Sequence, residues 1–114
     1  MMLNQRRVRG IQVLLLGGAL VWMFGSTAIA QDVAGLYKQK CSACHGADGS
    51  GNTAVGKSMH LRELGSADVQ KESDAELTAM ITDGKGAMPA YKDKLTADQI
   101  KQLVAFIRHF AKKE

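Results

Sequence analysis

Residues 41–45 of the chain are Cys41-Ser42-Ala43-Cys44-His45, and they contain both of its cysteines. This spacing is typical of covalent haem attachment, in which two thiols one helical turn apart each form a thioether with one vinyl group of the porphyrin. The histidine directly after the second thiol then extends its imidazole towards the iron. We therefore predict one haem c, bound through Cys41 and Cys44, with His45 as an iron ligand.

Two other kinds of site share the Cys-x-x-Cys spacing. A thioredoxin-like redox pair belongs to a βαβ unit, whereas this sequence has no sustained alternation of apolar and polar residues that would indicate strands. A structural zinc site needs four ligands, and the two remaining histidines, His60 and His109, lack the paired spacing of zinc ligands. Haem attachment is therefore the favoured interpretation of the motif.

The N-terminus has the pattern of a secretory signal peptide. Three arginines within residues 6–9 precede an apolar run over residues 11–24, and Ala28-Ile29-Ala30 forms a cleavage site. We predict that residues 1–30 are cleaved off and that residues 31–114 form the mature haem domain in the periplasm. The alternative is an uncleaved anchor, because residues 11–30 reach the roughly 20 residues that a membrane-spanning helix needs.

The mature domain predicted in this way is nearly neutral. Without the three arginines of residues 1–30, the 15 basic residues of the chain fall to 12 against 11 acidic residues, which leaves a formal charge of +1. No run of basic residues with interleaved aromatics is present either, so we expect no nucleic acid partner. So short a mature chain has room for only a thin core, which favours reinforcement by a cofactor.

The periodicity of apolar residues predicts an all-α domain of three to five helices, with long loops wrapped around the haem. Ser73 and Thr96 are followed three residues later by Glu76 and Gln99, which is the capping-box pattern of a helix N-terminus. Glycine-rich segments interrupt the helices because glycine favours turns. The predicted helices are 32–44, 66–71, 74–83 and 97–112, and the predicted loops are 46–56 and 84–95.

Methionine suits the sixth coordination position of haem iron in electron carriers, because its soft thioether raises the reduction potential. Met88 is the favoured ligand on positioning grounds. Gly84 and Gly86 let the chain turn and Pro89 makes the exit rigid, so that the side chain is presented from a loop. Met80 lies in the apolar stripe of a predicted helix, where methionine usually fills gaps in a core.

Three other side chains remain as alternative ligands. Met59 follows the glycine-rich loop but has no evident positioning device, and His60 is next to it. His109 lies near the end of the last predicted helix, where a basic residue interacts favourably with the terminal carbonyls. Surface roles are the better interpretation of both histidines.

With Cys41-Ser42-Ala43-Cys44-His45-Gly46 near its start and Gly86-Ala87-Met88-Pro89 in a late loop, the chain resembles the class I cytochromes c, and most of all the short bacterial monohaem forms. The resemblance spans residues 32–112. It implies a one-electron carrier rather than an enzyme, with iron bound by His45 on one face of the haem and by Met88 on the other.

The resemblance also implies that the first and last helices cross beside the haem, with Tyr37 and Phe106 as aromatic contacts there. The sequence departs from the family pattern at two places. Val33 occupies the position, eight residues before the first haem cysteine, where the family often has glycine, which predicts a wider or shifted crossing. The proline whose carbonyl often accepts a hydrogen bond from the proximal imidazole is missing, so we expect a carbonyl within residues 53–57 to replace it.

Charged side chains are candidates for contacts at the haem edge. Lysines in the surrounding segments would steer an acidic redox partner, although ordinary solvated lysines are an equally good interpretation. Arg62 either pairs with a haem propionate or has a surface role. The candidate lysines are Lys57, Lys85, Lys92 and Lys94.

We expect redox proteins as partners, and a mature form that is monomeric and not embedded in the membrane. Two other functions remain open on the sequence alone. One is a haem enzyme or gas-binding protein with an open sixth site on the iron. The other is a membrane-anchored haem subunit of a larger oxidoreductase complex.

Overall fold

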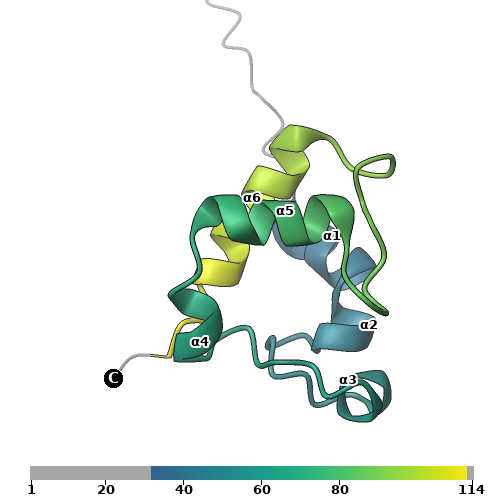
Figure 1. Cartoon of the computed structure of the whole chain (residues 1–114), viewed down its shortest axis with the longest axis vertical. Coiled ribbons are helices and arrows are strands. Elements are labelled where there is room, and N and C mark those ends of the chain that lie inside the picture. Colours follow the sequence, from purple (N-terminus) through teal and green to yellow (C-terminus); the bar gives the residue numbers. More distant parts are fainter. Residues whose placement is uncertain (1–31, 113–114) are drawn as a thin grey trace, which may run out of the picture.

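The computed structural model describes residues 32–112, and this part of the chain consists of helices and loops (Figure 1). The predicted all-α class is confirmed, although there are six helices within these residues rather than three to five. No strand occurs among them, and an isolated bridge joins Lys85 to Met88. The predicted signal peptide, residues 1–30, lies outside the described residues. The helices are α1 Val33–Lys40, α2 Ser42–His45, α3 Ala54–Ser58, α4 Ala67–Gln70, α5 Asp74–Asp83 and α6 Ala97–Arg108.

The first predicted helix is divided in two at a cysteine of the haem motif. Cys41 has φ −120° and ψ −35°, which separates α1 from α2. Hydrogen bonding nevertheless continues across the junction, because the Cys41 amide donates to the Tyr37 carbonyl and the His45 amide donates to the Cys41 carbonyl. The two helices therefore form one bent unit, which places both cysteines and His45 on successive turns.

The capping boxes predicted for the two longest helices are both formed. Ser73 and Glu76 cap α5, which has the predicted bounds, and Thr96 and Gln99 cap α6. The predicted end of α6 at residue 112 is wrong, because the helix ends at Arg108. Beyond it the chain turns so that Phe110 packs against Tyr37, with ring centroids 5.2 Å apart.

Two short helices lie in the middle of the chain. The prediction of a loop throughout residues 46–56 is wrong at its end, where α3 begins after Thr53, whose side chain accepts a hydrogen bond from the Gly56 amide at 2.8 Å. A threonine at this position caps a helix in the same way as Ser73 and Thr96. The helix α4 falls within the predicted range 66–71.

The core lies where α1 and α5 each pack against α6. As the resemblance implied, Tyr37 and Phe106 meet at the crossing of α1 and α6, with ring centroids 5.1 Å apart. Val33 packs on the edge of this core. Figure 1 shows α2 and α3 below the crossing of α5 and α6, and the loop after α5 runs down at the right of the view before it returns to α6. The buried hydrophobic residues are Tyr37, Val69, Leu77, Ile81, Leu95, Ile100, Leu103, Val104 and Ile107.

Arg108 ties the end of α6 to the junction of α4 and α5. Its guanidinium donates to the carbonyls of Gln70 at 2.9 Å and Glu72 at 2.6 Å, and to the carboxylate of Asp74 at 2.8 Å. One planar side chain thereby satisfies backbone acceptors at a chain reversal. This fixes α5, and the loop that follows it, relative to α6.

Candidate haem-binding site

A cavity of about 670 Å³ lies between the helices and the loops, and each of the six helices within residues 32–112 contributes at least one residue to its walls. The volume is within the roughly 300–1,000 Å³ of typical ligand pockets. Leu77 and Ile81 of α5 and Leu103 and Ile107 of α6 contribute buried apolar side chains to its wall. An apolar interior of this size suits a large planar macrocycle.

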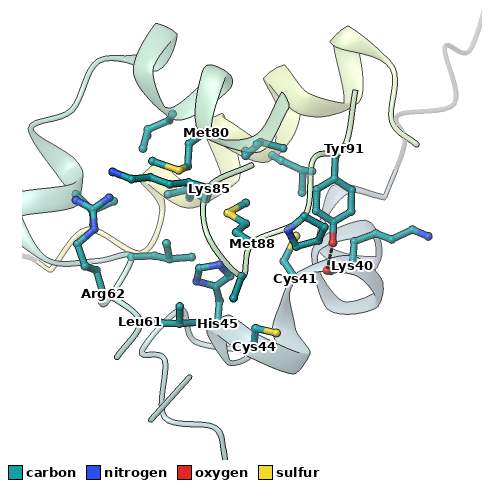
Figure 2. Close-up of a pocket in the computed structure, with 18 of the residues that line it drawn as sticks. Lys40, Cys41, Cys44, His45, Leu61, Arg62, Met80, Lys85, Met88 and Tyr91 are labelled. Atoms are coloured by element: carbon teal, nitrogen blue, oxygen red, sulfur yellow. Dashed lines mark hydrogen bonds between the residues drawn. The ribbon is translucent and has the colours of Figure 1, made fainter. Parts of the chain in front are cut away.

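All three residues of the predicted attachment motif line this cavity (Figure 2). Cys41 and Cys44 are free thiols and half-buried. Burial, followed by the charge of Cys44, raises the pKa of the Cys41 thiol to about 11. A thioredoxin-like pair instead needs a thiol with a lowered pKa. Within residues 32–112, no group of three or more His, Cys, Asp or Glu side chains could hold a metal ion, which argues against a zinc site there.

His45 is prepared to act as a neutral nitrogen ligand. Burial lowers the pKa of its imidazole, so the ring is uncharged near neutral pH and a nitrogen lone pair is free. Its Nδ1 atom is buried and has no hydrogen-bond partner. Buried polar atoms are nearly always satisfied, so a buried ring with an unsatisfied nitrogen, facing this cavity, fits a site whose occupant the polypeptide does not supply.

The predicted hydrogen bond from His45 to a carbonyl within residues 53–57 is not formed. The loop after the motif supports the motif's backbone instead. The Thr53 hydroxyl donates to the Cys44 carbonyl at 2.7 Å, and the Gly51 amide donates to the His45 carbonyl at 2.7 Å. A Cβ atom on Gly56 would lie 2.8 Å from the same Cys44 carbonyl oxygen, so only glycine permits this close approach.

Tyr37 braces the motif from the other side. Its hydroxyl donates to the Gly46 carbonyl at 2.7 Å, directly after His45. The resemblance indicated only an aromatic contact for Tyr37, and this hydrogen bond was not predicted. A buried tyrosine needs a partner for its hydroxyl, which is the signal that could have suggested one.

Three methionines line the cavity, in different ways. Figure 2 shows the side chains of Met80 and Met88 in the same space as the His45 ring. The prediction that Met80 is a core residue is wrong, because it is only half-buried, lies outside the buried core and lines the cavity. Met59 is 51% exposed at the rim.

The loop after α5 presents Met88 to the cavity, as predicted from Gly84, Gly86 and Pro89. Lys85 and Met88 exchange backbone hydrogen bonds of 3.1 and 3.0 Å across a tight turn. Gly84 has φ +68° and Gly86 has φ +58°, in the left-handed region that favours glycine. The turn therefore holds Met88 at the cavity, while Met80 projects from a helix.

The alternative histidine ligands differ in position. His60 is exposed at the rim of the cavity, with φ +52°, whereas His109 is exposed and does not line it. Of the four candidate lysines, only Lys85 lines the cavity. Arg62 is at the rim, and its guanidinium forms an ion pair of 2.5 Å with Glu72, which also lines the cavity and was not predicted.

Comparisons with known proteins indicate the family of this chain. A family model described as cytochrome c oxidase, cbb3-type, subunit III, matches residues 28–107. Cytochrome c6 of Synechocystis sp. is 31% identical over 104 residues, covering 89% of this chain and 82% of that protein. Cytochrome c6 of Leptolyngbya boryana is 33% identical over 78 residues, covering 68% of this chain and 88% of that protein.

A solved structure gives the same result for the fold. The KustC0563 c-type cytochrome superimposes with a TM-score of 0.66 at 37% identity, covering 71% of this chain and 99% of that chain. The residues that the family model matches, 28–107, include the attachment motif and the loop that carries Met88. The chain therefore belongs to the small class I c-type cytochromes, with a haem c attached covalently through Cys41 and Cys44.

Proposed function

We propose that this cytochrome is a periplasmic one-electron carrier in which His45 and Met88 would bind the haem iron. The observation that carries the proposal is that Met88, from the loop after α5, lines the same cavity as Cys41, Cys44 and His45. A thiol pair, an imidazole and a thioether from distant parts of the sequence form the donor set of a closed His/Met haem.

The bound haem supplies one-electron chemistry, and the protein supplies its ligands and surroundings. The neutral His45 imidazole and the Met88 thioether would hold the iron, so that the protein would need no substrate at that position. Leu77, Ile81 and Leu103 exclude water from the interior of the cavity. A low local dielectric and fixed ligands limit the rearrangement that accompanies electron transfer.

The domain organisation is part of the proposal. Residues 1–30 act as a cleaved signal peptide, and residues 31–114 form the mature monomer in the periplasm. None of the helices within residues 32–112 is long and apolar enough to cross a bilayer. Mass spectrometry of the exported protein should find a chain that begins at Gln31 with one added haem. A mass that includes residues 1–30 would contradict the cleavage.

Redox proteins are the proposed partners. Lys40 and Lys85 line the cavity, and Arg62 lies at its rim. Positive side chains at the site of electron transfer steer partners that carry an acidic patch, and they do so less at high salt. The rate of electron exchange with an acidic partner should therefore fall as ionic strength rises.

The axial ligands are tested by comparing Met88→Leu with Met80→Leu, a matched loss of a thioether from the same cavity. The ferric wild-type protein should show the sulfur-to-iron charge-transfer band, and Met80→Leu should keep it. Met88→Leu should lose the band. Its reduction potential should decrease, since the identity of the iron ligands changes haem potentials over a range of about 0.8 V. If Met80→Leu lost the band and Met88→Leu kept it, Met80 would be the ligand.

A further inference from the structure

The loop that carries Met88 is joined to the helix that carries the haem motif by one side chain. The Tyr91 hydroxyl donates a hydrogen bond of 2.9 Å to the Lys40 carbonyl, which is 51 positions away in the sequence (Figure 2). Lys40 is the last residue of α1 and directly precedes Cys41. The bond therefore joins the segment that carries Met88 to the segment that carries the haem motif, both of which line the cavity.

Tyr91 is also fixed through its backbone. Its amide donates to the Ile81 carbonyl of α5 at 3.1 Å, and its carbonyl accepts from the amides of Lys94 and Leu95 at 2.9 Å each. Among the hydrogen bonds of residues 32–112, the Tyr91 hydroxyl alone joins the segment 84–95 to α1. The backbone bonds anchor the loop to α5, and the hydroxyl sets its distance from α1.

The surroundings of Tyr91 suit a persistent donor. The side chain is half-buried and lines the cavity, and burial is the main cause that raises the pKa of its hydroxyl. The hydroxyl therefore stays protonated over the physiological range. Lys94 lies in the segment between Tyr91 and α6, and its ammonium group is 5.5 Å from the centre of the Tyr91 ring.

Opening of the methionine loop would have to break this hydrogen bond. The two hydrogen bonds between Lys85 and Met88 close the turn on itself and do not tie it to α1. Within residues 32–112, the hydrogen bond that would resist movement of the loop away from the haem motif is therefore that of Tyr91. We propose that Tyr91 is a positioning residue whose hydroxyl latches the loop to Lys40 and so keeps Met88 on the iron. This inference rests on the proposed His45/Met88 coordination.

The test uses the ferric holoprotein with imidazole, which competes with Met88 for the iron. Tyr91→Phe keeps the ring and removes only the hydroxyl. A net hydrogen bond is worth about 0.5–1.5 kcal/mol, so imidazole should bind about two- to tenfold more tightly to Tyr91→Phe than to the wild type.

Ser42→Ala is the matched control. The Ser42 hydroxyl also donates to a carbonyl of α1, that of Lys38 at 2.6 Å, but Ser42 does not line the cavity. This variant should bind imidazole with the wild-type affinity. If Tyr91→Phe had no effect, or no larger effect than Ser42→Ala, the latch would be disproved.

A double-mutant cycle shows whether Tyr91 acts through Met88. In the Met88→Leu background there is no thioether to hold, so Tyr91→Phe should leave imidazole affinity unchanged. An equal gain of affinity in both backgrounds would mean that Tyr91 controls access to the cavity, and the proposal would be wrong. Failure of the coordination itself is recognised separately, because Met88→Leu alone would then keep the sulfur-to-iron band.

Discussion

At the level of single residues, the burial of Tyr37 should make the stability of the protein depend on pH. It is 2% exposed, and its hydroxyl donates to the Gly46 carbonyl. Burial is the main cause that raises the pKa of its hydroxyl well above the usual value of about 10, and the charge of Asp48 acts in the same direction. The folded protein therefore holds a proton on Tyr37 that the unfolded chain releases above about pH 10.

The free energy of unfolding should consequently fall with rising pH in the wild type. The contribution of Tyr37 to the free energy of unfolding is fully present below the pKa that its hydroxyl has in the unfolded chain. Above that pKa the contribution declines by up to about 1.4 kcal/mol per pH unit. Tyr37→Phe should be about 0.5–1.5 kcal/mol less stable at pH 8, and the difference should shrink by pH 11. Denaturant unfolding at both pH values measures it; a constant difference would contradict the predicted titration.

The attachment residues could be predicted from the sequence because their chemistry is tied to a fixed spacing. Met80 could not be assigned correctly, since an apolar stripe on a helix looks the same whether it faces a protein core or a cofactor cavity. The contact of Tyr91 with Lys40 was also unpredictable. Its acceptor is a backbone carbonyl, which has no signature in the sequence.

At the level of helices and loops, prediction succeeded where a local signal determines the structure. The capping boxes of α5 and α6 are local, and both N-termini were predicted correctly. The end of α6 depends on tertiary contacts instead, because Phe110 turns towards Tyr37 and a Cβ on Gly65 would lie 2.2 Å from the Phe110 carbonyl oxygen. Periodicity within one helix contains no information about such contacts.

The loop after α5 depends on close packing at Gly84. A Cβ atom there would lie 2.5 Å from the Met88 carbonyl oxygen and 2.7 Å from the Ala90 amide nitrogen. Gly86 has a similar positive φ, but a Cβ on it would meet no atom within 4 Å. Alanine at position 86 therefore introduces backbone strain alone, whereas alanine at position 84 should also displace the loop.

Gly84→Ala should weaken the bond between Met88 and iron, whereas Gly86→Ala should cause only the roughly 1 kcal/mol of strain expected for a left-handed alanine. The measurement is the intensity of the sulfur-to-iron band in the two ferric variants. We expect a weakened or missing band in Gly84→Ala and a wild-type band in Gly86→Ala. Equal bands in both would show that the loop tolerates a Cβ at Gly84.

At the level of the whole molecule, the hydrophobic core is a shell around the haem site. Within residues 32–112, only Ile100 and Val104 of the buried hydrophobic residues do not line the cavity. The other buried residues have the cavity on one side. The cofactor is therefore expected to complete the core as well as to carry the electron, as the small size of the mature chain suggested.

Without haem, this arrangement should not persist. At about 24 cal/mol per Å³, an empty cavity of about 670 Å³ would cost roughly 16 kcal/mol, an upper bound because the cavity opens to solvent. Folded domains are stable by only about 5–15 kcal/mol. The Cys41→Ala/Cys44→Ala variant, purified free of haem, should therefore lose much of its far-ultraviolet helical signal and melt without a cooperative transition. An apoprotein with the helical content and cooperative melting of the holoprotein would show that the helices pack without the cofactor.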